Sequence, residues 1–215
     1  MRSFLIIGMG SFGHHLCRAL VEQKCDIMIA DKDEKNLEDM LPYVVSAKIG
    51  DCTKADVLKE FGVESFDACF VCMGDNFQNS LQITSLLKEL GAKKVYSKAD
   101  EDVQAKFLLR NGADRIIYPD YQVAVRLAFS ESSGNIFDCV ELSKDYMICE
   151  IAAIPAWLGK SLRDLDFRAK YNMSILATKT NDVVNPLPPA DYIFNTEDHV
   201  IVLGHVNDIK KVLRK

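Results

Sequence analysis

Short apolar runs alternate with longer amphipathic segments over roughly the first 132 residues of the chain. The apolar runs have the length of buried strands and cover residues 4–7, 27–30, 44–49, 68–72, 95–97 and 115–118. The segments between them have the length of helices and cover residues 12–22, 34–41, 54–61, 76–90 and 102–111. Such alternation is typical of a parallel sheet with crossover helices. We therefore predict an α/β domain built on a doubly wound, parallel, Rossmann-type sheet.

The pattern changes after Pro119. Residues 121–132 form a helical stretch that is apolar over more than half of its circumference, so this helix is expected to need a partner surface. Further on, the chain shows strand-like runs at 137–142, 147–153, 174–179, 192–194 and 199–203, a helix at 161–171 and a basic helical turn at 210–215. We expect a Rossmann domain over residues 1–132 and a second, smaller α+β domain over residues 136–215.

Composition narrows the class of protein. The chain has 215 residues, 48% of them hydrophobic, and a formal net charge of -5, which argues against a nucleic-acid partner. No apolar run approaches the roughly 18 to 20 residues that cross a bilayer, and the opening residues contain no signal-peptide cleavage site. A cytoplasmic protein without direct membrane insertion is expected. The seven cysteines lie mostly in apolar stretches, which favours reduced thiols.

A glycine-rich loop follows the first predicted strand and opens the first predicted helix. It reads Gly8-Met9-Gly10-Ser11-Phe12-Gly13. In a dinucleotide fingerprint the first glycine permits a tight turn, the second lets the backbone approach a diphosphate, and the third lets the helix pack on the strand. The helix N-terminus supplies unpaired N–H groups. The pattern predicts that an adenine nucleotide binds at this loop.

Asp31 ends the second predicted strand, where a carboxylate accepts hydrogen bonds from both ribose hydroxyls. Its charge would repel a 2′-phosphate. This favours NAD(H), ATP, ADP or AMP over NADP.

Two further segments end predicted strands at the carboxyl edge, where open α/β sheets bind ligands. Asp51 and the backbone of Cys52 are expected near the adenine, although Asp51 also suits a cap for the helix that follows. Met73, Gly74 and Asp75 close the fourth strand, and Gly74 would allow a close approach of the ligand.

Two enzyme-like alternatives have weaker support. An NAD-dependent oxidoreductase would share the loop and Asp31 but needs a proton donor, and the four histidines do not obviously supply one. A metal or redox module is suggested by Cys69 and Cys72. Residues three apart on a strand face opposite sides, so both thiols are expected to be buried core residues.

The chain resembles the RCK family, the cytosolic regulators of Trk- and Ktr-type potassium transport. The resemblance covers nearly all of the sequence. Its most specific motif is Gly112-Ala113-Asp114-Arg115-Ile116-Ile117-Tyr118-Pro119. Other matching segments are the glycine loop and residues 29–33, 50–53, 77–80, 97–99 and 164–171 together with Pro188-Pro189.

The resemblance implies a gating subunit without enzymatic activity. Nucleotide binding in the first domain would change the angle between paired domains, and a tetrameric or octameric ring of such homodimers would gate an integral-membrane potassium channel or transporter. The helix at 121–132 would be the crossover that locks two subunits together.

The resemblance also implies ligand contacts. Lys32, which follows Asp31, and Asn79 fall in matching segments. ATP-selective relatives often carry Arg where this chain has Ser11, so NAD(H) or a diphosphate nucleotide gains weight, with Lys98 and Arg115 as candidate phosphate contacts. No metal site is assigned, although Asp120 stands where some relatives help to hold a divalent cation.

The second domain carries one further ligand expectation. Some Ktr-type relatives bind cyclic di-AMP across the interface between C-terminal domains. Arg168, Asn172 and Ile175 stand near the matching region, with Pro189 opposite. The alternative for Arg168 is a structural hydrogen bond at a helix end.

Overall fold

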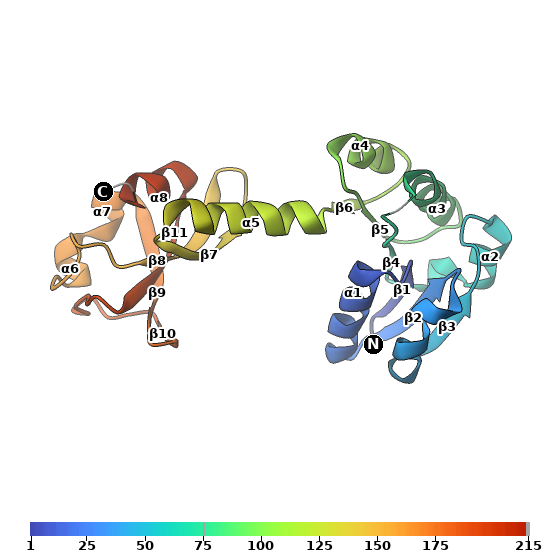
Figure 1. The fold of residues 1–215 in the computed structure, drawn as a ribbon, viewed down its shortest axis with the longest axis horizontal. Coiled ribbons are helices and arrows are strands. Elements are labelled where there is room, and N and C mark those ends of the chain that lie inside the picture. The colour runs from blue at the N-terminus through green and yellow to red at the C-terminus, as the bar shows by residue number, and fades with distance from the viewer. Residues whose placement is uncertain (75, 214–215) are drawn as a thin grey trace. The chain divides into compact units, whose positions relative to one another are not determined.

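The fold, taken from a computed structural model, describes residues 1–74 and 76–213 and divides the chain into two compact units, Met1–Tyr121 and Gln122–Lys215 (Figure 1). The first unit holds a six-stranded sheet in the order β3-β2-β1-β4-β5-β6, and all of its strand pairs are parallel. Its strands are β1 (Ser3–Ile7), β2 (Asp26–Asp31), β3 (Ser46–Ile49), β4 (Ala68–Val71), β5 (Val95–Lys98) and β6 (Arg115–Ile117). This is the doubly wound sheet predicted from the apolar runs.

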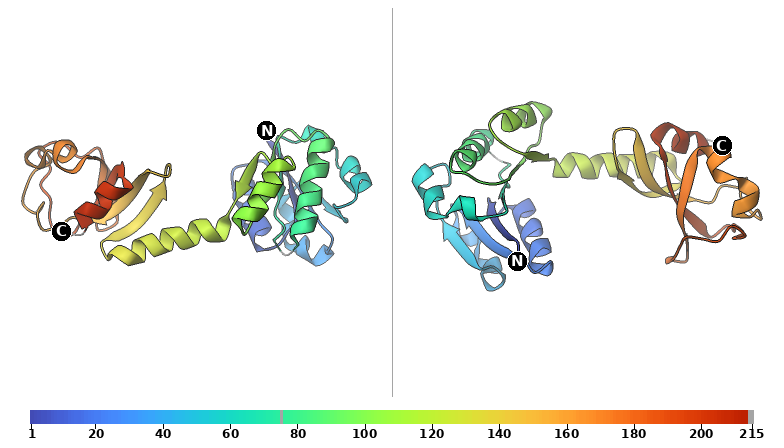
Figure 2. Two further views of the ribbon diagram at one scale, coloured as in Figure 1. Left: turned by 90° about the horizontal axis from the view of Figure 1, so that it is seen from above. Right: turned by 180° about the vertical axis from the view of Figure 1, so that it is seen from behind.

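Helices cover both faces of this sheet, as the views of Figure 2 show. One face packs against α1 (Ser11–Glu22) and the short helices η1 (Glu34–Asn36) and η2 (Glu38–Tyr43). The other face packs against α2 (Ala55–Glu60), η3 (Val63–Ser65), α3 (Phe77–Glu89) and α4 (Asp102–Arg110). Apolar runs of β1 and β4 are buried from both sides, which explains their nearly continuous hydrophobicity.

The helix predicted at 34–41 is wrong in type. The chain forms two 3-10 helices there, and Pro42 lies inside the second. Proline lacks an N–H and disfavours α geometry in the residue before it, so a regular α-helix cannot run through this segment. Asp33 caps the first of the two through the Lys35 amide, 3.1 Å away.

The expected apolar helix is α5 (Pro119–Ser133). The division between the two units falls within its first turn, after Tyr121. Tyr121, Val123 and Leu127 leave 65%, 65% and 58% of their surface exposed. Phe129 instead packs on the core of the second unit, with the Lys210 ammonium 5.5 Å from its ring centre. The side of α5 that carries Phe129 is therefore used within the chain, whereas Val123 and Leu127 lie one turn apart on another side and remain uncovered.

The second unit holds an antiparallel sheet in the order β10-β9-β11-β8-β7. Its strands are β7 (Ile136–Glu141), β8 (Tyr146–Ala152), β9 (Met173–Thr180), β10 (Val183–Pro186) and β11 (Asp198–His205), and its helices are α6 (Leu162–Leu165), α7 (Phe167–Tyr171) and α8 (Val206–Leu213). The core gathers around Trp157, which is fully buried beside Phe167 and Phe194. This confirms the predicted smaller α+β domain.

Details of this domain differ from the sequence prediction. The helix predicted at 161–171 is two helices, because Asp166 takes a left-handed conformation between them. Residues 192–194 are not a strand and make one isolated bridge, Ser161 to Ile193. The strand in this part of the chain is β10, which the sequence prediction missed. In the described part of the chain, no helix is both long and apolar enough to span a bilayer.

Candidate functional site

The glycine loop joins the end of β1 to the start of α1. Gly8 has φ +91°, which favours glycine, and its amide donates to the Ala30 carbonyl at 2.9 Å. A Cβ on Gly13 would lie 2.2 Å from the Gly8 carbonyl oxygen, so the third glycine is required for the helix to pack on the loop. A Cβ on Gly10 would meet no atom within 4 Å. Gly10 therefore borders open space, as expected of the glycine that faces a ligand.

The other members of the loop divide into backbone and side-chain roles. Gly10 is the N-cap of α1 and supplies no side-chain cap, so amides of the first turn keep their hydrogen-bonding capacity. Met9 is buried and Phe12 half-buried in the core beneath α1. These two side chains anchor the loop, whereas Ser11 is exposed at the first position of the helix.

Asp31 is bonded to the glycine loop itself. One carboxylate oxygen accepts from the Met9 amide at 2.7 Å, and the other accepts from the Asp33 amide at 3.0 Å. Ile7 pairs with Ala30, so Asp31 stands level with Gly8 at the carboxyl edge. The sequence prediction gave Asp31 a role toward the ligand and did not foresee that it also holds the loop.

Asp51 forms a local turn and does not cap the helix that follows, because the N-cap of α2 is Lys54 and no side chain caps this helix. Its carboxylate accepts from the Thr53 hydroxyl at 2.7 Å and the Thr53 amide at 3.1 Å, in the turn that leads into α2. These bonds, with smaller contributions from Lys54 and Lys32, hold the pKa of Asp51 below its usual value. Cys52 is buried, which raises the pKa of its thiol to about 12. Lys32 itself is exposed.

Lys98 lies across Gly74 at the carboxyl edge, beyond the end of β4. A Cβ on Gly74 would stand 2.7 Å from the Lys98 ammonium, so a larger residue here would push the end of this side chain aside. The ammonium pairs with Asp100 at 2.9 Å, and the Lys98 side chain is 15% exposed. Asp100 was missed by the sequence prediction, although its position two residues after a strand-ending lysine was a usable signal.

The neighbouring loop is described in part. Met73 packs beside Gly8, and the Asn76 side chain caps α3 through the Asn79 amide at 3.1 Å. Asp75 lies outside the described residues. Asn79 is half-buried in the first turn of α3.

Arg115 is placed apart from the other candidates. It is exposed at the first position of the edge strand β6 and pairs with Tyr96, whereas the carboxyl ends of these strands are Ile117 and Lys98. The sequence gave a signal for this, because the predicted strand 115–118 starts at Arg115 and so places this residue at the amino end of its strand.

His14 makes a contact that the sequence did not predict. One ring nitrogen lies 3.2 Å from the Gly10 carbonyl oxygen and the other 2.8 Å from a carboxylate oxygen of Asp39. Hydrogen bonds from His14, and then Arg18, hold the pKa of Asp39 below its usual value. This connects the 3-10 segment η2 to the first turn of α1, where Gly10 is the N-cap.

Cys69 and Cys72 face opposite sides of the sheet, as predicted. Cys69 packs with the helices α2 and α3, and Cys72 packs with α1. Within residues 1–74 and 76–213, no group of three or more His, Cys, Asp or Glu residues is arranged to hold a metal ion. Asp120 is exposed in the first turn of α5.

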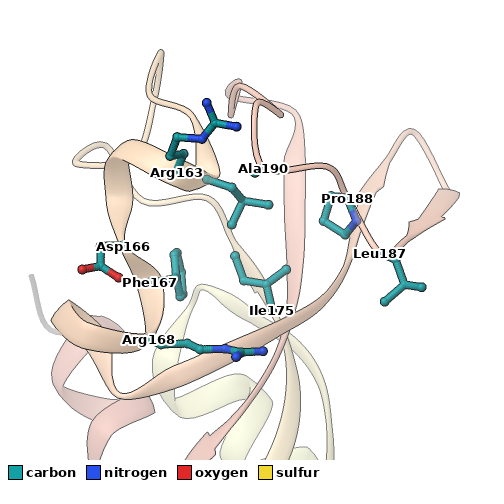
Figure 3. Close-up of a pocket in the computed structure, with 9 residues that line it drawn as sticks. Arg163, Asp166, Phe167, Arg168, Ile175, Leu187, Pro188 and Ala190 are labelled. Atoms are coloured by element: carbon teal, nitrogen blue, oxygen red, sulfur yellow. The ribbon is translucent and has the colours of Figure 1, made fainter.

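The second unit contains an open pocket of about 400 Å³ between α6, α7 and the segment that follows β10 (Figure 3). The Arg168 side chain extends along one edge beneath Ile175, and Pro188 and Leu187 lie opposite. Asp166, between α6 and α7, also lines the pocket. The pocket thus brings together Arg168 and Ile175 from the predicted set.

The other two predicted pocket residues do not line it. The side-chain amide of Asn172 donates to the Asp208 carboxylate at 2.9 Å, which ties the end of α7 to α8. Pro189 was predicted to lie opposite Arg168. The proline that lines the pocket there is its neighbour Pro188.

The fold and loop define a Rossmann-type domain with a nucleotide-binding fingerprint, followed by a small α+β domain. The chain belongs to the TrkA family: the TrkA-N domain matches residues 4–119 and the TrkA-C domain matches residues 148–215. This confirms the resemblance drawn from the sequence motifs.

Two relatives from Bacillus subtilis (strain 168) match nearly the whole chain. The Ktr system potassium uptake protein C is 39% identical over 210 residues, and the Ktr system potassium uptake protein A is 33% identical over 210 residues. Each match covers 98% of this chain and 95% of the relative. Both are named for potassium uptake and not for an enzymatic reaction, which agrees with the prediction of a non-enzymatic protein.

Solved structures show the same fold. The GsuK RCK domain matches with a TM-score of 0.68 at 14% identity over 100% of this chain, and the GsuK channel bound to NAD matches with a TM-score of 0.69 at 15% identity over 97%. The chain covers 47% and 38% of those two chains, less than half of their length.

Proposed function

We propose that this chain is the cytoplasmic, nucleotide-sensing subunit of a potassium uptake system. The observation that carries the proposal is the match to two Ktr potassium uptake proteins over nearly the full length of both chains. The subunit would be held at the membrane by an integral-membrane channel or transporter and would regulate potassium flux through it.

The glycine loop is the proposed nucleotide site. It combines an open second glycine, free amides at the start of α1 and the fixed carboxylate of Asp31. The relation to the GsuK channel, which has been solved bound to NAD, supports NAD(H) as one ligand class. Asp51 and Cys52 would border the adenine, and Asp31 would accept from the ribose.

The choice of nucleotide follows from charge. Ser11 adds no positive charge at the start of α1, and the Lys98 ammonium is already paired with Asp100. A ligand with two phosphates, such as NAD(H) or ADP, therefore suits this loop better than ATP.

A homodimer is the proposed unit of assembly, extended to a ring by further copies. Val123 and Leu127, one turn apart on α5, leave a row of apolar side chains exposed, which a second copy would cover. A nucleotide would act on the ring only through its difference in affinity between two arrangements of the paired domains.

Cyclic di-AMP is the proposed ligand of the second domain. The pocket offers the Arg168 guanidinium, which suits a phosphate, and the apolar side chains of Ile175 and Pro188, which suit an adenine face. Asn172 is bonded to Asp208 and is left out of this proposal.

Thermal stability with a panel of ATP, ADP, AMP, NAD and NADH tests the first-domain site, because a ligand that binds the folded state raises its stability. We expect NAD(H) or ADP to raise the melting temperature of the full chain and Asp31→Ala to abolish that rise. Asp56→Ala, which removes a carboxylate that is 95% exposed, is the matched control. A chain that responds to none of the five nucleotides would contradict the proposal.

A further inference from the structure

Two cysteines face each other across neighbouring strands of the second domain. The register of β7 and β8 sets Cys139 directly opposite Cys149. At the hairpin end, the Leu142 amide donates to the Tyr146 carbonyl at 3.0 Å. Hydrogen-bonded and non-hydrogen-bonded pairs alternate along an antiparallel ladder, which makes Cys139 and Cys149 a non-hydrogen-bonded pair.

This kind of pair brings side chains closest together. Its Cα atoms lie about 4.5 Å apart in regular sheets. Disulfides span Cα separations of roughly 4.4 to 6.8 Å. The backbone therefore needs little movement to accept a bond between the two sulfur atoms.

Both thiols lie on the inner face of the sheet in one buried cluster. Cys139 is 7% exposed and Cys149 is fully buried. Burial raises the pKa of both thiols, that of Cys149 to about 12, and Cys139 is the more exposed of the two. Cys139 is thus the better placed of the two to react first.

The position of β7 gives a route to these thiols. β7 is the last strand in the sheet order, so among the described strands it pairs with β8 alone. Edge strands separate from a sheet more readily than central strands do. The other five cysteines belong to the first unit, and no strand register there sets two of them opposite each other.

We propose that Cys139 and Cys149 are a reversible oxidation site, at which a peroxide joins the two strands through a disulfide. The Cys139 thiolate attacks one oxygen of hydrogen peroxide, the O–O bond breaks and hydroxide leaves, which gives a sulfenic acid. The Cys149 sulfur then attacks the Cys139 sulfur, and the S–O bond breaks. Both leaving hydroxides take up thiol protons, so two thiols and one peroxide give one disulfide and two waters.

The disulfide would fasten the edge strand to its neighbour. β7 starts at Ile136, shortly after the end of α5 at Ser133. Oxidation would therefore stiffen the segment where α5 enters the second domain. The site stands apart from the nucleotide loop and does not depend on the proposed function.

Peroxide treatment of the full chain tests the proposal. After treatment, the protein is unfolded, alkylated and mapped by mass spectrometry. Before alkylation, we expect the intact protein to be two mass units lighter than the untreated protein. After digestion, we expect a cross-linked peptide joining Cys139 to Cys149. Dithiothreitol should reverse both changes fully. Cys25→Ser, which removes a partly exposed cysteine, should leave this result unchanged, whereas Cys139→Ser and Cys149→Ser should abolish it.

A second measurement separates bond stability from reaction rate, because buried thiols react slowly. Prolonged incubation with oxidised glutathione, which takes up the same two electrons as two molecules of reduced glutathione, should yield the same cross-link in the wild-type protein. Amide exchange in β7 should then slow about tenfold or more. Seven free thiols after both treatments, or a cross-link between other cysteines, would overturn the proposal.

Discussion

Gly10 and Gly13 have opposite requirements although both belong to the same loop. Gly13 is buried against the Gly8 carbonyl, whereas Gly10 borders open space and has an ordinary φ of -72°. Gly13 must be glycine because the fold leaves no space for a side chain. Gly10 is glycine because a ligand needs the open space beside it.

Replacing each of these glycines with Ala should therefore have distinct effects. Gly13→Ala is expected to lower the free energy of unfolding by about 2 kcal/mol or more, because its Cβ overlaps backbone. Gly10→Ala should change stability by less than about 0.5 kcal/mol and weaken nucleotide binding instead. Urea denaturation and calorimetric titration with NADH measure the two effects. Equal stability of both variants would contradict this assignment.

Asp114 is a second residue whose role is set by its bonds. Its carboxylate accepts from the Val95 amide at 2.6 Å and the Lys88 ammonium at 3.1 Å. Burial acts to raise its pKa, but these two partners outweigh burial and hold the pKa below its usual value. The carboxylate joins the starts of β5 and β6 to α3.

Asp114→Asn is expected to lower the free energy of unfolding by about 1 kcal/mol at pH 7, a modest amount because the side chain is 41% exposed. A folded-state pKa below the unfolded value near 3.9 means that the full contribution is present above that value. It is lost as the pH falls through the folded-state pKa. The gap between variant and wild type should therefore close below about pH 4.

Urea denaturation at pH 7, 5 and 3 checks this dependence. Asp56→Asn serves as the control, because Asp56 is 95% exposed and lies 3.7 Å from Lys59. A gap for Asp114→Asn that stays constant down to pH 3 would show that charge plays no part.

At the scale of elements, the sequence predicts strands better than short helices. Strands β1 and β4 are buried from both sides, so their apolar runs are unmistakable. β10 is exposed at all four positions and lies at an edge, so its sequence carries no burial pattern. The segment 192–194 looks like a strand because it must place Phe194 in the core.

The candidate site follows the same division. Glycine spacing and strand ends predict the loop and the position of Asp31, because both depend on local sequence. The bond from the Met9 amide to Asp31 joins residues 22 positions apart, and the Lys98 ammonium lies against Gly74 of a different loop. Such contacts arise from strand pairing, which a linear pattern does not contain.

Helix α5 gives a prediction at this scale. Leu127→Asp places a charge in its exposed apolar row, and we expect the dissociation constant of the homodimer to rise about a hundredfold or more. Gln122→Asp, which adds the same charge at an exposed polar position of the same helix, should have little effect. Light scattering across a concentration series measures both. Unchanged dimerisation in Leu127→Asp would place the subunit interface elsewhere.

For the whole molecule, the two units have separate cores and separate candidate ligand sites. Asp31→Asn is expected to remove the thermal shift caused by NADH while the shift caused by cyclic di-AMP remains. Arg168→Ala should give the reverse result. Loss of both shifts in either variant would mean that the two sites depend on one another or that the variant is misfolded, and circular dichroism distinguishes these outcomes.

The bonds from Asp31 to the glycine loop have a kinetic consequence. A loop held in shape by its own carboxylate does not have to be ordered by an arriving nucleotide, so little binding energy is lost to restricting the backbone. Exchange between competing nucleotides should then be limited by how fast each one leaves. In a cell, such a loop would follow the ratio of its competing ligands closely.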